Sequence, residues 1–199
     1  MSRPLEIWFE FASTYSHVAV QRVEAEAERA RIELVWRVFP LGPIFQKQGW
    51  NDSPFNLYPV KGAYMWRDME RLCAKHEIPF RTPSQFPRNG LLAARVTLAA
   101  ESEPWIGRFV RAVYLGNFAE DADISEPKRV RGWLESAGCP KPDSLLELAG
   151  SAEIKERLRA RTDDALARGI FGAPTFVAGN EIFWGNDRLE DAIAWLRRA

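Results

Sequence analysis

The first structured stretch of the chain reads Leu5-Glu6-Ile7-Trp8-Phe9-Glu10-Phe11-Ala12-Ser13-Thr14-Tyr15-Ser16. Apolar and mixed positions alternate with period two as far as Phe11, which is the pattern of a strand. Residues 12–15 break this pattern, and residues 16–31 show helical periodicity with one apolar face. Residues 32–38 alternate again and are rich in β-branched and aromatic side chains. The spacing therefore predicts a strand, a helix and a second, parallel strand, joined by a right-handed crossover.

The middle of the chain, from Phe39 to about Gly150, has a different pattern. Pro40, Pro43, Pro54 and Pro59 punctuate a loop-rich stretch in which strand alternation is absent. Helical periodicity follows, and it predicts helices over about 65–76, 91–100, 105–115 and 127–138. We expect this part of the chain to be an all-helical insertion.

The C-terminal part alternates helix and strand again. Its expected elements are an amphipathic helix from Ser151 to Arg168, a hairpin of strands 175–178 and 181–184 around Gly179-Asn180, and a last helix that carries Leu189, Ile193 and Leu196. Ser151 is expected to be the N-cap of the first of these helices, and Asp187 that of the last. A βαβ half and an αββα half, separated by helices, is the connectivity of an interrupted thioredoxin fold. We therefore expect an α/β, thioredoxin-like domain of residues 1–40 and 151–199, with residues 41–150 as the helical insertion.

The composition excludes several classes of partner. The 199 residues include 27 basic and 27 acidic side chains, so no net charge attracts nucleic acid or an anionic membrane. No run approaches the roughly 20 apolar residues that span a bilayer, and the N-terminus lacks the pattern of a secretory signal. Cys73 and Cys139 lie far apart without a CxxC, and the chain has only two histidines, so no metal site is expected. These features favour a reducing cytoplasm.

The turn between the first strand and the first helix is the first candidate for chemistry. In a thioredoxin fold a redox CxxC lies here, because the helix N-terminus offers free N–H groups and partial positive charge to a thiolate. Ser13 and Ser16 occupy the outer positions of that window, so disulfide exchange is excluded. A serine hydroxyl still donates a hydrogen bond to a thiolate that a cofactor brings. On these residues alone, a simple N-cap role for either serine stays open.

Further candidates surround this turn. Pro174, just before the hairpin, is expected to be cis and to face the N-terminus of the first helix, which leaves the backbone of Ala173 free to pair with an extended peptide. Asp187 could take the ammonium of a γ-glutamyl group, and Asn186 could donate to its carboxylate. Asn51 and Lys61 in the proline-rich loop are further candidates, although an exposed lysine can also be a simple solvated charge. Trp50, Trp66 and Trp184 could form the walls of an aromatic pocket, and core packing is the alternative for them.

These motifs together resemble a known family. Residues 9–16, FEFASTYS, resemble the FDF-x-SPYS opening of the 2-hydroxychromene-2-carboxylate isomerases and the kappa-class glutathione transferases. Residues 51–65 look like the NxPP…P-x-KG-x-YM segment of the kappa class, and residues 124–127 resemble a helix-start motif of the group. Residues 169–189, GIFGAPTFVAGNEIFWGNDRL, are very similar to the family's GVFGVPT…WWGNDRL tail. One departure is Thr14, which replaces the usual proline.

The resemblance implies a thioredoxin domain with a helical insertion, a homodimer, and glutathione as cofactor. By position, Ser13 would contact the glutathione sulfur, Ala173 beside cis-Pro174 would pair with the cysteinyl unit, and Asn186 and Asp187 would hold the γ-glutamyl end. Asn51 and Lys61 would contact glutathione or a substrate carboxylate. The leading expectation is a glutathione-dependent isomerase of aromatic-pathway compounds. Alternatives are a kappa-class transferase, a non-catalytic glutathione-binding protein and, against the missing CxxC, a disulfide oxidoreductase relative.

Overall fold

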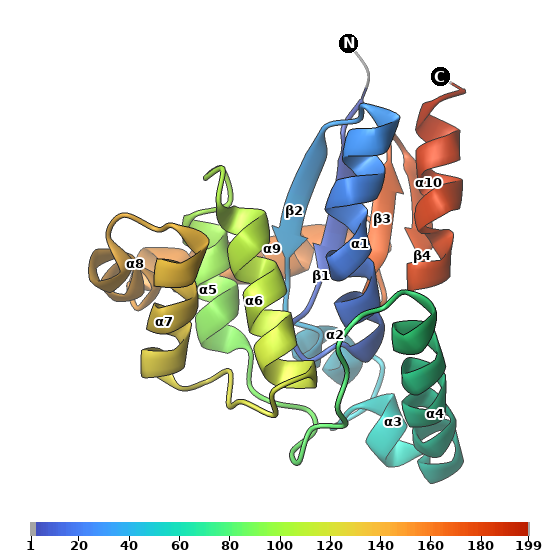
Figure 1. Ribbon diagram of the computed structural model, residues 1–199, viewed down its shortest axis with the longest axis horizontal. Helices are drawn as coiled ribbons and strands as arrows, with labels where there is room; N and C mark the ends of the chain where they lie inside the picture. Colours follow the sequence, from blue (N-terminus) through green and yellow to red (C-terminus); the bar gives the residue numbers. More distant parts are fainter. Residues whose placement is uncertain (1–2, 199) are drawn as a thin grey trace.

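A mixed sheet with the strand order β2–β1–β3–β4 lies at the centre of the computed structural model, which describes residues 3–198 (Figure 1). Its strands are β1 (Leu5–Phe9), β2 (Leu34–Val38), β3 (Thr175–Ala178) and β4 (Glu181–Trp184). β1 pairs in parallel with β2 and antiparallel with β3, and β3 pairs antiparallel with β4. The predicted parallel unit and the predicted hairpin are both confirmed.

The first helix, α1 (Thr14–Ala30), begins two residues before the position that periodicity indicated. It ends at Arg31, whose left-handed backbone, with φ of 58°, turns the chain back onto the C-terminal carbonyl groups of the helix. This turn delays β2, which begins at Leu34 rather than at Ile32.

The middle of the chain is helical, as expected. Its helices are α2 (Gly42–Lys47), α3 (Pro54–Leu57), α4 (Pro59–Lys75), α5 (Leu91–Ala99), α6 (Ile106–Phe118), α7 (Pro127–Ala137) and α8 (Pro142–Ala149). The prediction of a loop-rich stretch around Pro40 to Pro59 was wrong in one respect, because the short helices α2 and α3 lie there. Pro43, Pro54 and Pro59 stand in the first turns of helices, where their missing N–H costs no hydrogen bond.

The C-terminal helices are α9 (Ala152–Ala167) and α10 (Leu189–Leu196). Ser151 is the N-cap of α9, and its Oγ accepts a hydrogen bond from the Ile154 N–H at 3.2 Å. The expectation that Asp187 caps the last helix was wrong. Residues 186–188 form a 3₁₀ turn, and the Asp187 carboxylate pairs with Arg188 at 2.9 Å instead of with a helix N–H.

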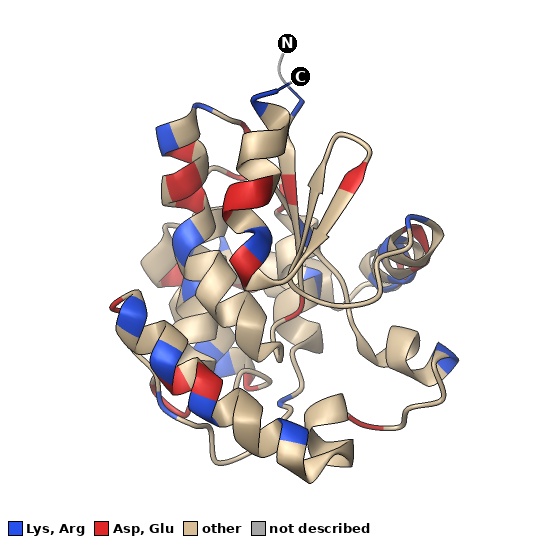
Figure 2. Ribbon diagram, turned by 90° about the vertical axis from the view of Figure 1, so that its right-hand side faces the viewer, with Lys and Arg blue, Asp and Glu red and all other residues tan. Residues whose placement is uncertain are grey.

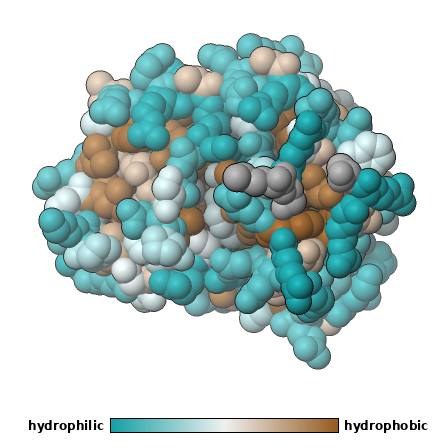
Figure 3. Space-filling model, turned by 90° about the horizontal axis from the view of Figure 1, so that it is seen from above, coloured by the Kyte–Doolittle hydropathy of each residue, from teal (hydrophilic) through white to brown (hydrophobic). Residues whose placement is uncertain are grey.

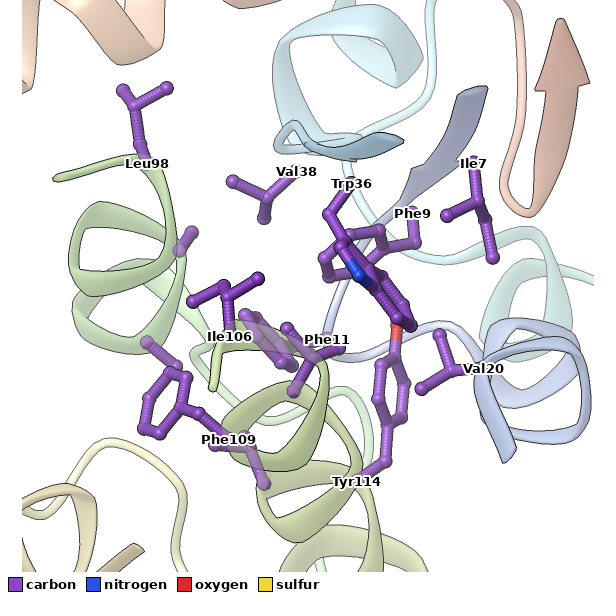
Figure 4. Packing of buried hydrophobic residues seen from close by; sticks show 14 of the residues in the cluster. Ile7, Phe9, Phe11, Val20, Trp36, Val38, Leu98, Ile106, Phe109 and Tyr114 are labelled. Atoms are coloured by element: carbon purple, nitrogen blue, oxygen red, sulfur yellow. The ribbon is translucent and has the colours of Figure 1, made fainter. Parts of the chain in front are cut away.

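The central strands β1 and β3 are buried on both faces, whereas the edge strand β4 is largely exposed. Ile7 and Phe9 point to the side of α1, α6 and α10, where Phe9 meets Trp36 and Tyr114 (Figure 4). Trp8 points to the other side, into a cluster that includes α9. The inserted helices α5 and α6 share the first core with β1, so they lie beside the loop that follows this strand (Figures 1 and 4). The division into residues 1–40 with 151–199 and residues 41–150 remains a prediction.

Acidic and basic residues alternate along several of the helices that face the viewer in Figure 2. Seen from above, hydrophobic residues show between hydrophilic ones rather than as one continuous face (Figure 3). Within residues 3–198, none of the helices has the length and apolar character needed to cross a bilayer.

Candidate active site

One cleft, with a volume of about 1520 Å³, opens where β1 ends and α1 begins. It is lined by the turn after β1, by parts of α2 to α5 and α9, and by the ends of β3 and β4. All the predicted site residues line this cleft: Ser13, Asn51, Lys61, Ala173, Pro174, Asn186 and Asp187. The structure therefore brings together residues that are spread over most of the chain.

Ser13 is the N-cap of α1, and it also faces the cleft. Its Oγ accepts a hydrogen bond from the Ser16 N–H at 3.3 Å and donates one to the Ala173 carbonyl oxygen at 2.9 Å. Ser16 is fully buried and does not line the cleft. The two roles weighed for Ser13, cap and cleft residue, are thus compatible in one side chain.

The loop before β3 lies beside Ser13. The Ala173–Pro174 peptide bond is cis, as expected. The Ala173 N–H makes no hydrogen bond within the described residues, so an extended ligand can pair with it. Phe171 and Trp184 flank the loop with ring centroids 4.9 Å apart, and both side chains are about half exposed. Gly172 permits this arrangement, because a Cβ there would lie 2.5 Å from the Trp184 Nε1.

Gly185 turns the chain from β4 toward Asn186 and Asp187. Its φ of 118° suits only glycine, and a Cβ at this position would lie 2.5 Å from the Asp187 Oδ1. Asn186 is buried at the cleft wall, whereas the Asp187 side chain is 64% exposed. The turn therefore presents one amide and one carboxylate to the cleft.

Asn51, between α2 and α3, and Lys61, in α4, line the cleft and are exposed to solvent. The Lys61 Nζ lies 5.7 Å from the centre of the Phe55 ring. α4, which carries Lys61, is tied to α1 by the Tyr15 hydroxyl, which donates to the Asp68 Oδ2 at 3.0 Å. Burial, and then the Asp68 carboxylate, raise the pKa of Tyr15, so this phenol keeps its proton. Of the three candidate tryptophans, Trp50 and Trp184 line the cleft and Trp66 does not.

Glu10 is a cleft residue that the sequence reasoning missed. Burial raises the pKa of its carboxyl from the ordinary 4.5 to about 7, although the Ala12 N–H donates to its Oε2 at 3.0 Å. The sequence held one signal for it, namely an ionisable residue directly after a buried strand and three positions before Ser13. A carboxyl group with a pKa near neutrality can both accept and donate a proton, which suits proton transfer.

Two buried side chains of α6 hold the turn that carries Ser13. The Tyr114 hydroxyl donates to the Glu10 carbonyl oxygen at 2.6 Å, and the Asn117 Nδ2 donates to the Phe11 carbonyl oxygen at 3.0 Å. Arg88 in turn donates to Asn117 Oδ1 at 3.2 Å and pairs with Asp121. Sequence periodicity marked α6 as a helix but did not indicate these contacts, because each joins segments far apart in the chain.

The chemistry open to this cleft follows from its donors. Within residues 3–198, no group of histidine, cysteine and carboxylate side chains has the arrangement of a metal site. The cleft instead offers a hydroxyl and helix N-terminus at Ser13, a free backbone N–H at Ala173, and the cation of Lys61. Such groups bind a peptide-like ligand and stabilise negative charge on it.

A thioredoxin-type sheet whose cis-proline loop faces a serine at a helix N-terminus defines a thioredoxin-fold protein without a redox cysteine pair. The family described as DSBA-like thioredoxin domain matches residues 4–194, and the chain belongs to this family. Within it, the chain belongs with the 2-hydroxychromene-2-carboxylate isomerases and kappa-class glutathione transferases, which are enzymes.

Three comparisons support this placement. The 2-hydroxychromene-2-carboxylate isomerase of Sphingobium xenophagum is 30% identical over 191 residues, which cover 96% of each chain. Human glutathione S-transferase kappa 1 is 26% identical, over 96% of this chain and 89% of its own. A solved structure of a 2-hydroxychromene-2-carboxylate isomerase superposes with a TM-score of 0.85 at 25% identity and covers 98% of this chain and 97% of its own.

Proposed function

We propose that this protein is a glutathione-dependent cis–trans isomerase of the 2-hydroxychromene-2-carboxylate isomerase type, acting on a small aromatic or unsaturated compound. The observation that carries the proposal is the position of the Ser13 hydroxyl, at the N-terminus of α1 and 2.9 Å from the Ala173 carbonyl oxygen in the cleft. The similarity to the Sphingobium isomerase supports the same assignment.

The residues of the cleft fit glutathione. The free N–H of Ala173 would donate to a carbonyl of the tripeptide, and its carbonyl oxygen would accept from an amide N–H. The exposed carboxylate of Asp187 suits the ammonium group of the γ-glutamyl end, and the amide of Asn186 suits its carboxylate. Asn51 and Lys61 would contact glutathione or the carboxylate of the substrate.

Ser13 has one proton to donate, and this proton now serves Ala173. If a ligand amide N–H donates to the Ala173 carbonyl oxygen, it replaces the Ser13 hydroxyl as the donor there. The hydroxyl can then donate to the thiolate instead, so every polar group keeps a partner. The helix N-terminus adds up to about 1 kcal/mol for a negative charge in its first turn. One pKa unit corresponds to about 1.4 kcal/mol, so these two effects raise the ionised fraction of a bound thiol severalfold.

Bound glutathione would supply the thiolate that adds reversibly to an unsaturated carbon of the substrate and so permits rotation about the former double bond. The protein holds the reactants together and stabilises the oxyanion that develops on the substrate. Lys61 or Asn51, on the rim of the cleft, is our candidate for that role.

A kinetic assay separates this function from its runner-up, a kappa-class transferase, which the similarity to the human enzyme favours. An isomerase should interconvert a hydroxychromene carboxylate and its benzylidene pyruvate without consuming glutathione. A transferase should instead conjugate a chlorinated nitrobenzene. If calorimetry detects no glutathione binding at millimolar concentration, both assignments fail.

Two further alternatives predict other outcomes. A non-catalytic glutathione-binding protein would bind glutathione and turn over neither substrate. A disulfide oxidoreductase would reduce insulin, which the absence of a CxxC argues against. We further propose that the protein is a cytoplasmic homodimer, which fractionation and light scattering would test.

A further inference from the structure

The cations that line the cleft differ in whether the protein neutralises them. Arg88 pairs with Asp121, Arg188 pairs with Asp187 and Asp191, and Arg159 pairs with Glu156. Arg95 differs from these arginines, because it forms no ion pair with any carboxylate within residues 3–198. An unpaired, half-buried guanidinium that faces a cleft has lost part of its hydration without gaining a partner.

Arg95 is also partly unsatisfied as a hydrogen-bond donor. Its Nε is buried and has no hydrogen-bond partner in the structure. Buried polar atoms in proteins are nearly always paired, so the Arg95 guanidinium is under-satisfied inside the protein. Because Arg95 lines the cleft, a ligand there can meet the outer end of the same guanidinium group. Arginine binds planar carboxylates through two parallel N–H···O bonds, which matches the chemistry of an organic acid.

Arg95 lies in an arm of the cleft formed by α5 and α9, which pack against each other. Leu91, Ala94 and Leu158 give this arm an apolar lining. Its other charged side chains, Lys155, Arg159 and Asp163 on α9, are all exposed to solvent, so Arg95 is the more enclosed charge. The arm therefore combines an apolar surface with one enclosed cation.

The start of α5 brings this arm of the cleft next to the turn that carries Ser13. A Cβ on Gly90, the N-cap of this helix, would lie 2.8 Å from the Phe11 Cβ, so the helix begins against the turn that carries Ser13. Arg95 follows Gly90 by about 7 Å of helical rise. A flat molecule could therefore lie along α5 with an unsaturated carbon near Ser13 and an anionic group at Arg95.

We propose that Arg95 binds the carboxylate of the compound that meets glutathione in this cleft, and that it selects small aromatic or unsaturated acids over their uncharged analogues. This inference rests on the proposed function. It assigns the carboxylate to Arg95 on α5, rather than to Asn51 in the loop after α2 or to Lys61 on α4.

Glutathione also carries carboxylates, but its expected contacts lie elsewhere. Ser13, Ala173, Asn186 and Asp187 come from the turn after β1 and from the loops around β3 and β4, whereas Arg95 belongs to helix α5 in the middle of the chain. The cleft volume of about 1520 Å³ exceeds the roughly 300–1,000 Å³ of common single-ligand pockets, which leaves room for a second ligand.

The test compares cinnamate with cinnamamide, which differ in charge but hardly in shape. Calorimetry with S-methylglutathione present would measure their affinities for the wild type, Arg95→Gln, Arg95→Lys and the matched control Arg67→Gln. Arg67 is an exposed arginine of α4 that does not line the cleft. We expect the wild type and Arg67→Gln to prefer cinnamate at least about tenfold, Arg95→Gln to lose this preference, and Arg95→Lys to keep part of it.

The affinity for glutathione separates this proposal from the proposed function. It should stay within twofold of wild type in Arg95→Gln, and a large loss would assign Arg95 to the cofactor and overturn the inference. Retention of the cinnamate preference in Arg95→Gln, or its absence in the wild type, would overturn the inference as well. If the wild type binds no glutathione but Arg95→Gln still abolishes a preference measured without S-methylglutathione, the proposed function fails and the anion site stands.

Discussion

The Ser13 hydroxyl donates a hydrogen bond of 2.9 Å to the Ala173 carbonyl oxygen, although 160 positions separate the two residues in the sequence. This contact joins the N-terminus of α1 to the cis-proline loop and places both at one wall of the cleft. A ligand that donates to the Ala173 carbonyl oxygen would therefore compete with the Ser13 hydroxyl for this acceptor.

Replacing Ser13 with alanine should separate its chemical role from its capping role. We expect Ser13→Ala to lower turnover by at least tenfold, with glutathione affinity changed less than threefold, because in the proposed mechanism the hydroxyl stabilises the thiolate and does not bind the rest of glutathione. The lost cap should also reduce stability by about 1 kcal/mol. Steady-state kinetics, calorimetry and thermal unfolding measure these quantities.

Ser151→Ala is the matched control for this loss of a cap. Ser151 caps α9 through the same type of bond and does not line the cleft. It should lose similar stability and keep full turnover. Unchanged turnover in Ser13→Ala would show that the Ser13 hydroxyl has no catalytic role.

Glu10 should make stability depend on pH. Its folded pKa of about 7 lies above the ordinary 4.5, so the folded state binds more protons and its stability falls as pH rises between these values. Glu10→Gln keeps an acceptor for the Ala12 N–H and removes the buried charge. We expect the variant to gain on the order of 1–3 kcal/mol over the wild type at pH 8, and little at pH 4.5.

Denaturant unfolding of both proteins from pH 4.5 to 8 measures this difference. Burial lowers the pKa of His17 to about 4, which gives an opposite slope at acid pH, but this contribution is common to both proteins and cancels. Glu33→Gln, at an exposed glutamate before β2, is the control and should show no such trend. A pH-independent difference between Glu10→Gln and the wild type would contradict the burial argument.

Thr14→Pro should stabilise the protein. Thr14 is the first residue of α1, where a missing N–H costs nothing, and Ser13 already has the extended backbone that a following proline requires, with φ of −75° and ψ of 118°. The Thr14 Oγ1 is buried without a partner. The variant should unfold about 2–4 °C higher, with turnover within twofold.

Thr14→Ala isolates one part of this effect. It removes the unpaired hydroxyl without stiffening the backbone, so it should recover only a fraction of the gain. A melting temperature of Thr14→Pro below that of the wild type would show that the threonine is required at this turn.

Gly185→Ala should weaken glutathione binding through Asp187. The added methyl group would lie 2.5 Å from the Asp187 Oδ1, at a backbone φ of 118° that favours glycine. We expect at least a tenfold loss of glutathione affinity by calorimetry. Gly169→Ala is the control, since its φ is 77° but its Cβ would meet nothing within 4 Å. Gly169→Ala should lose about 1 kcal/mol of stability and keep its affinity for glutathione. Equal glutathione affinities in the two variants would show that Asp187 does not bind glutathione.

The sequence by itself determined the four strands and most of the helices of this protein, but not the short helices α2, α3 and α8. Alternation located β1, the Gly179-Asn180 turn set the β3–β4 hairpin, and Ser151 marked the start of α9. These signals are local, because backbone hydrogen bonds and side-chain periodicity depend on neighbours a few residues away. The prolines of the middle segment misled the same reasoning, since a proline both breaks helices and begins them.

Only the tertiary structure decided which of these residues act together. The contact of Ser13 with Ala173, the raised pKa of Glu10 and the unpaired guanidinium of Arg95 all arise where segments distant in sequence meet. The motif residues were candidates from their positions in the chain, and the fold placed them around one cleft. Desolvation and hydrogen-bond partners are properties of packing, so the electrostatics of a site follow from the folded chain rather than from any local stretch of it.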